Sequence, residues 1–471
     1  MKKNNLPLLI LAVPLLAGVL MARPVDKVKP VEGYDKSSLP TTINLNDYSD
    51  NDIRSYYADL NEKSESERKG NNLLKNLKPI LKNGQKYYSY DVSNGTDIWK
   101  MYEITDRDWN KSPASEIQGY DSNTNTITGY SYGSSATSKG SNPYIHALYV
   151  NRGVENNVRA WATNEGKTSH GGNNEWCIDR EHIWPKSHGF SEDTKEKSDP
   201  GYDAATSGAR GDPMHLWAGD SYVNSILHSN YFYGYVDKTK SYTDGKNKYT
   251  YVSNNLMGVS KTLGGTTKVF EPQDSDKGDI ARAVFYMVAR YNNIAGGDIV
   301  ENDNPNLELV NDLSVWVVNG YISSSSVTGK LGITKDLLEW NKLDPVDNYE
   351  LHRNNLLYRN FTNNRNPFID FPEWADYIWG TNSEGKFANP ASNAIARPQD
   401  FVPPTDNGTK DDGLLFGLPK LYVYIGAGVI GVVVLIVVIA IMAKGSKKQK
   451  KALKEVGKKV IKSTSKSKKK R

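Results

Sequence analysis

The amino-acid sequence predicts an α+β fold, on the evidence of two periodic patterns and one apolar run. Residues 278–291 and 334–341 repeat apolar side chains at helical spacing. Residues 87–149 are rich in Tyr, Ser, Thr, Gly and Asn and contain short alternating runs, which predict strands and loops. Residues 421–443 carry no charge, which predicts one C-terminal transmembrane helix beyond a mixed, helix-rich domain.

Helix-start residues support two of the helical segments. Thr334 is the expected N-cap of the helix over 334–341. A shorter helix is predicted from Ser221 to His228, with Asp220 as its N-cap. In that helix Asn224 lies four residues before His228, so the two side chains share a face.

Residues 1–22 have the pattern of a secretory signal. Two lysines precede an apolar run from Leu6 to Ala22, and cleavage is expected after Ala22. Because Leu20 is large for the position it would occupy in such a cleavage site, an uncleaved N-terminal anchor stays open.

The C-terminal segment predicts the orientation of the chain in a membrane. Residues 444–471 follow the predicted span and contain 13 Lys, one Arg and one Glu. Such an excess of positive charge marks the cytoplasmic side and attracts anionic lipid. We therefore expect a single-pass protein of the cell membrane with its main domain outside. A nucleic-acid-binding tail is the alternative.

Composition divides the rest of the chain into three parts. Residues 23–75 predict a polar stalk, 76–380 the main domain, and 381–420 a linker rich in Pro, Asn, Gly and acidic residues. The chain carries a net charge of +5, of which the tail supplies +13, so residues 1–443 carry −8. Any electropositive surface for nucleic acid must therefore be local. Cys177 is the only cysteine, which excludes an intramolecular disulfide.

The segment 179–187 places an arginine, a carboxylate and an imidazole side by side, as Arg180, Glu181 and His182, and it ends after Pro185. A guanidinium can hold a phosphate, a carboxylate can hold a hard metal ion, and an imidazole can accept a proton near neutral pH. Taken alone this segment does not fix the chemistry, which the downstream residues decide.

A second block supplies further ligands. On the predicted helix, the amide oxygen of Asn224 can meet the carboxylate of Glu181. Oxygen ligands of this kind, completed by water, suit one Mg²⁺ or Mn²⁺ ion rather than zinc. We expect Asn230 to cap or orient backbone.

The chain resembles the bacterial endonuclease I family, which comprises secreted or periplasmic nucleases with a His-Me (ββα-metal) finger. The resemblance rests on ordered blocks between about Tyr87 and Gly380. They are Arg180-Glu181-His182-Ile183-Trp184-Pro185, Asp212 to Asn230, Phe270-Glu271-Pro272, residues 277–282, 338–346 and 350–354, and Asn364-Arg365-Asn366-Pro367-Phe368-Ile369-Asp370.

This resemblance implies a role for three residues. His182 would be the general base that deprotonates water, and Glu181 and Asn224 would hold the metal ion. Adjacent side chains on a regular strand point to opposite faces, so the backbone must bend between Glu181 and His182 for them to share a site.

The chain departs from the family in two places. Met214 stands where many relatives have a histidine in the block that begins at Asp212, so His215 is expected to keep the orienting role. Relatives also use an arginine between the two main blocks to hold the scissile phosphate, whereas none lies between Arg180 and Arg210. The arginines that could serve instead are Arg210, Arg282, Arg353 and Arg365.

Two readings of the later arginines stay open. One is a buried polar network that holds the fold, and the other is a phosphate-binding wall. The residues concerned are Asp279 with Arg282, and Arg353 with Asn364 and Arg365.

The sequence thus predicts a membrane-anchored, outward-facing, metal-dependent nuclease. DNA with little sequence preference is the expected substrate, RNA is not excluded, and no obligate protein partner is evident. The alternative is a non-catalytic adhesin or nucleic-acid receptor on a nuclease scaffold.

Overall fold

A computed structural model describes the central part of the chain. The described residues are 38–88, 90, 97–132, 143–150, 178–189, 208–265, 267–296, 305–311 and 329–380, with short strands at 317–318, 321–322, 414–415 and 418–419. Within them, no helix combines the length and apolar character needed to cross a membrane. The predicted signal, transmembrane span and basic tail lie outside these residues, as does most of the predicted linker.

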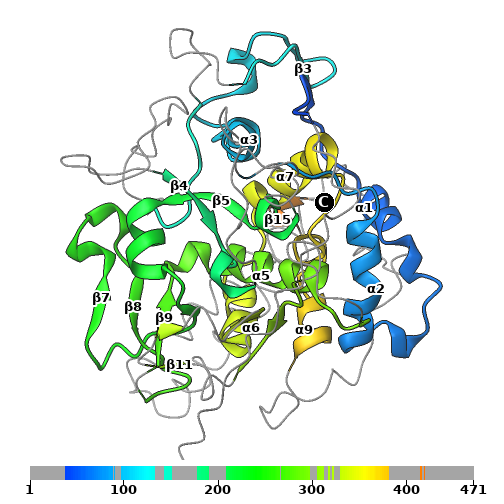
Figure 1. The fold of residues 1–471 in the computed structure, drawn as a ribbon. Helices are drawn as coiled ribbons and strands as arrows, with labels where there is room; N and C mark the ends of the chain where they lie inside the picture. Colours follow the sequence, from blue (N-terminus) through cyan, green and yellow to red (C-terminus); the bar gives the residue numbers. More distant parts are fainter. Residues whose placement is uncertain are drawn as a thin grey trace, which may run out of the picture.

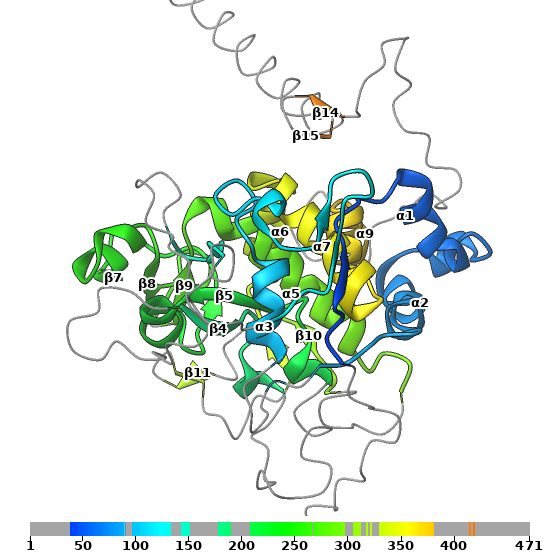
Figure 2. The ribbon, with the colours of Figure 1, turned by 90° about the horizontal axis from the view of Figure 1, so that it is seen from above.

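Helix α5 (Lys277–Tyr291) forms the centre of the domain, and all fifteen of its residues are buried. Helices α6 (Thr334–Leu343), α2 (Gly70–Lys82) and α8 (Pro367–Asp370) pack against it. Figures 1 and 2 both show α5 among these helices. The helices predicted at 278–291 and 334–341 are therefore confirmed. The N-cap of α6 is Ile333, however, and Thr334 is the first helical residue.

The predicted polar stalk is wrong for residues 38–75. This part of the chain forms β1 (Thr42–Asn44), α1 (Asp50–Tyr56) and the first part of α2. The apolar residues of α2 recur on one side of the helix and are buried, namely Leu73, Leu74, Leu77, Ile80 and Leu81. They are separated by Lys and Asn, so the segment is polar on average although one face is apolar.

A second difference lies at α3 (Asp97–Thr105), in a stretch that the sequence predicts as strands and loops. Ile98, Met101 and Tyr102 of this helix are at most 2% exposed. Their spacing of three and four residues fits a helix, but the neighbouring segments are rich in Tyr and Thr, which favour strands. Packing against β5 and α7 decides for the helix.

The strands form small sheets around the helices. The largest has the order β6-β9-β8-β7, from β6 (Phe232–Tyr233), β7 (Tyr242–Asp244), β8 (Leu256–Val259) and β9 (Lys268–Glu271). Strand β1 pairs with β3 (Thr126–Thr128), which also pairs with β2 (Tyr120–Asp121). Helices α7 (Asn348–Leu356) and α9 (Trp374–Trp379) and the π-helix η10 (Leu357–Thr362) complete the C-terminal part. The predicted α+β class is confirmed.

Candidate active site

The candidate site is built on a hairpin of β4 (Ile178–His182) and β5 (Leu216–Asp220). The two strands are antiparallel, with Glu181 opposite Trp217 and His182 opposite Leu216. Arg353 supports the hairpin by donating a hydrogen bond to the carbonyl oxygen of Leu216 (2.8 Å). Beyond β5 the chain enters a helix, so the predicted strand–strand–helix order is present (Figure 1).

That helix, η6 (Val223–His228), is a π-helix rather than two turns of α-helix. The amide of Ser229 donates to the carbonyl oxygen of Asn224, five residues earlier (2.7 Å). Asp220 caps the start as predicted, because its Oδ1 accepts from the amides of Tyr222 and Val223. π-helical turns are rare in proteins, and those that do form are frequently found at functional sites.

One face of β4 gathers basic side chains around Tyr90. The guanidinium of Arg180 lies 3.9 Å from the centre of the Tyr90 ring, and that of Arg210 lies 5.3 Å from it. The imidazole of His182 packs on the same ring, with the ring centres 4.7 Å apart. The structure thus brings together Arg180, His182 and Arg210, which the sequence predicts as catalytic.

His182 is held as a neutral imidazole. Its Nε2 lies 2.9 Å from the carbonyl oxygen of Arg210. A carbonyl oxygen only accepts, so Nε2 carries the proton and Nδ1 carries the lone pair. Burial lowers the pKa of His182 well below its ordinary value, and the nearby His215 acts in the same direction. A neutral ring with a lone pair is what a general base requires.

His215 is fully buried and fixes the loop beside His182. Its Nε2 donates to the carbonyl oxygen of Ala209 (2.7 Å), and its Nδ1 accepts from the amide of Trp184 (3.4 Å). It therefore connects the turn before Arg210 with the segment after β4. Burial lowers the pKa of His215 to about 4, so it acts by positioning backbone.

Glu181 points to the opposite face of β4. Its Oε1 accepts from the hydroxyl of Tyr149 (2.7 Å) and lies 2.6 Å from Nδ1 of His228. The strand remains paired through His182, so the predicted bend between Glu181 and His182 is wrong. Regular pairing to Leu216 keeps the alternation of faces.

One buried carboxylate oxygen of Glu181 is available to a hard divalent ion. Glu181 is fully buried, and no described residue forms a hydrogen bond to its Oε2. A buried carboxylate oxygen in this state requires a partner. Asn224 is half-buried on η6, but this helix contacts Glu181 through His228 instead. In the described part of the chain, no group of three or more His, Cys, Asp and Glu is arranged for a metal.

Asp212 fastens the loop before His215 to the rest of the domain. Asp212 accepts hydrogen bonds from Gln85, from the hydroxyls of Tyr286 and Tyr291 on α5, and from the amide of Met214. It thereby fastens the loop that leads to His215 onto the central helix. The backbone carbonyl oxygen of Asn230 lies 2.8 Å from Nε2 of the buried His188, a contact that does not test the capping role predicted for the Asn230 side chain.

The three predicted substrate-binding arginines are structural, which corrects the expectation of a phosphate-binding wall. Arg282, Arg353 and Arg365 are at most 2% exposed. Arg353 pairs with Asp106 (3.2 Å) and Arg365 pairs with Asp370 (2.6 Å). Both guanidiniums form ion pairs with buried carboxylates and cannot reach a phosphate at the surface.

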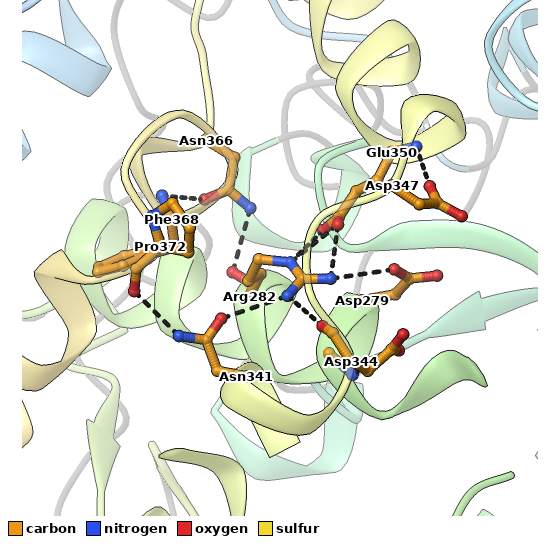
Figure 3. A network of polar contacts seen from close by, with 10 residues as sticks. Asp279, Arg282, Asn341, Asp344, Asp347, Glu350, Asn366, Phe368 and Pro372 are labelled. Atoms are coloured by element: carbon orange, nitrogen blue, oxygen red, sulfur yellow. Dashed lines mark hydrogen bonds and ion pairs between the residues drawn. The ribbon is translucent and has the colours of Figure 1, made fainter. Parts of the chain in front are cut away.

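Arg282 occupies the centre of a larger network (Figure 3). Its guanidinium contacts Glu350 (2.6 Å), Asp279 (3.2 Å) and the carbonyl oxygen of Asp344 (2.7 Å). Of the two roles left open for Asp279 and Arg282, the structure therefore shows the buried polar network, which lies between α5 and α7. Burial raises the pKa of Glu350, and the charge of Arg282 opposes that effect.

The site also contains Tyr90, Tyr149 and His228, which the motifs of the sequence do not predict there. Tyr90 and Tyr149 come from segments far from the motif and carry no local signal. His228 lies four residues after Asn224, on the same face of the predicted helix. This spacing of four residues could have indicated its contact with Glu181. Its ring also stacks on Tyr233, with ring centres 4.6 Å apart.

Comparisons with known proteins agree with this geometry. The family model described as Endonuclease I matches residues 69–373. The extracellular ribonucleases of Bacillus subtilis (strain 168) and Bacillus amyloliquefaciens are each 38% identical over 231 residues. That match covers 48% of this chain and 62% of each relative. No solved structure matches. The family model covers more than half of the chain, from α2 to the C-terminal helices, and the chain therefore belongs to the endonuclease I family.

Proposed function

We propose that this protein hydrolyses phosphodiester bonds of nucleic acid with the help of one divalent ion, Mg²⁺ or Mn²⁺. The observation that carries the proposal is the cluster of Arg180, His182 and Arg210 around Tyr90, backed across β4 by buried Glu181. Family membership points to the same reaction class.

Each group has a task in this reaction. His182 takes a proton from the attacking water at Nδ1, because Nε2 is committed to the carbonyl oxygen of Arg210. Arg180 and Arg210 offset the negative charge of the phosphate. The open Oε2 of Glu181 and the amide oxygen of Asn224 would hold the ion, which would supply charge neutralisation at the phosphate and the leaving oxygen. Because Glu181 and His182 point to opposite faces of β4 in this structure, the end of the strand must turn for the ion and the base to act on one phosphate.

The substrate is nucleic acid in a broad sense. The sequence predicts DNA with little sequence preference, and the two relatives are named ribonucleases. The deciding experiment is a digest of plasmid DNA, linear duplex DNA and RNA by the purified full-length chain, with and without EDTA. Cleavage that EDTA abolishes supports the proposal. Binding of nucleic acid without cleavage of any substrate would indicate the non-catalytic receptor instead.

Removal of the proposed metal ligands should weaken metal binding. We expect Glu181→Ala to lose detectable Mg²⁺ or Mn²⁺ affinity in calorimetry. Asn224→Ala should lose about 10–100-fold and regain part of its activity at high metal concentration. Ser225→Ala, an exposed change on the same helix, is the matched control. Wild-type affinity in both ligand variants would remove these residues from the site.

We also propose that the nuclease domain faces the outside of the cell, anchored by the predicted span at 421–443. The N-terminal signal pattern, the basic tail and the extracellular relatives support this placement. Protease added to intact cells should digest the region between residues 23 and 420 and spare an epitope placed after Lys444. Protection of the domain in intact cells, with digestion after lysis, would contradict the outward orientation.

A further inference from the structure

A partly exposed aromatic and basic surface lies beside the helix that carries Asn224. Ile226, in that helix, is 54% exposed. The rings of Tyr222 and Tyr249 meet edge to face, with centres 5.5 Å apart, and both side chains are half-buried. The Nζ of exposed Lys248 lies 5.5 Å from the centre of the Tyr249 ring. We call Tyr222, Ile226, Lys248 and Tyr249 the tyrosine platform.

The platform comes from two elements that the fold brings together. Tyr222 immediately precedes η6, and Ile226 lies four residues later within this helix. The two side chains therefore take neighbouring positions on the helix. Lys248 and Tyr249 lie between the short turns η7 (Gly245–Asn247) and η8 (Thr250–Val252), after strand β7. Strands β8 and β9 of the large sheet contact η6, which also contacts β5, and Figure 2 shows β9 beside β5.

Hydrogen bonds connect this loop directly to the candidate site. Asn255 donates from Nδ2 to the carbonyl oxygens of Tyr149 (2.8 Å) and Val252 (2.9 Å). The hydroxyl of the same Tyr149 donates to Glu181. The amide of Tyr249 in turn donates to the carbonyl oxygen of Gly245 (2.9 Å). The loop that carries Tyr249 is therefore anchored to the residue that orients Glu181.

We propose that the tyrosine platform stacks an unpaired base of the substrate, so that single strands bind better than duplexes. This inference rests on the proposed nuclease function. Aromatic rings beside cations are the usual means of holding single strands, because every base has a face for stacking and every linkage carries a negative charge. Lys248 and the neighbouring exposed Lys246 supply that charge complement. In a duplex the bases already stack on one another, so the platform adds little.

The test compares affinity and cleavage for single-stranded and duplex oligonucleotides. Fluorescence anisotropy in EDTA gives Kd, and cleavage in Mg²⁺ gives kcat and KM. We expect Tyr249→Ala and Tyr222→Ala to raise Kd and KM for single strands about 5- to 100-fold, with kcat and duplex affinity nearly unchanged. Tyr249→Phe should keep wild-type values because the ring remains. Tyr242→Ala, at a tyrosine 41% exposed on β7, is the control.

Single-stranded RNA and single-stranded DNA of one sequence form two arms of the experiment. Equal losses in both arms support stacking on a base, whereas a loss confined to RNA would indicate a contact to the 2′-hydroxyl and overturn the inference. A loss of the same size on duplex, or a change below twofold on all substrates, would also overturn it. Lys248→Gln, a change at an exposed side chain, repeats the test with less risk to the fold. Failure of the wild type to cleave any substrate would reject the nuclease function, while the anisotropy values still decide the inference.

Discussion

Replacement of His182 by alanine should lower kcat by about 10²–10⁴-fold, the usual contribution of a general base. The imidazole is buried, neutral and oriented by the carbonyl oxygen of Arg210, and it lies beside two arginines. Removal of the ring takes away the side chain that accepts the proton from water in the proposed reaction. The measurement is single-turnover cleavage of a fluorescent oligonucleotide at saturating enzyme.

Two controls separate the loss of a base from the loss of the fold. His352→Ala changes a partly exposed histidine on α7, paired with Asp47 at 3.2 Å, and should leave kcat within about twofold, as expected of a side chain remote from the reaction. Nucleic-acid affinity in EDTA should be nearly the same for His182→Ala and the wild type. Retention of more than roughly a tenth of wild-type kcat by His182→Ala would contradict its role as the base.

The second large effect concerns stability. Arg282→Met should lower the free energy of unfolding by about 3–5 kcal/mol, because removal of one partner leaves buried charge uncompensated. Glu350 and Asp279 would then face each other without the guanidinium that separates them, and the carbonyl oxygen of Asp344 would lose its donor. Urea denaturation followed by tryptophan fluorescence measures the change.

Comparison with a surface ion pair tests this explanation. Lys342 on α6 pairs with Asp376 at 2.8 Å, but its side chain is 62% exposed. Lys342→Met should therefore cost less than about 1 kcal/mol. The double change Arg282→Met with Glu350→Leu should recover part of the loss, because it removes the stranded charge as well. An Arg282→Met variant as stable as the wild type would show that the network does not hold the fold.

Much of the fold was predictable where the information is local. The helices at 278–291 and 334–341 follow from apolar spacing within each segment, and the cap at Asp220 follows from its position before η6. The ordered motifs predicted the family, which the family model confirms. By contrast, Leu73 and Ile98 lie in segments whose average composition conceals a buried face, so the stalk and strand predictions failed there.

The sequence by itself determined the family and the candidate residues Arg180, Glu181 and His182. Only the tertiary structure decided which arginines pair with buried carboxylates and which face of β4 each residue occupies. Arg353 and its partner Asp106 are 247 residues apart, and Tyr149 reaches Glu181 across 32 residues. The local sequence around either partner is the same whether or not they meet. Burial of a charge is decided by long-range packing, because only the complete core brings its counter-charge within hydrogen-bonding distance.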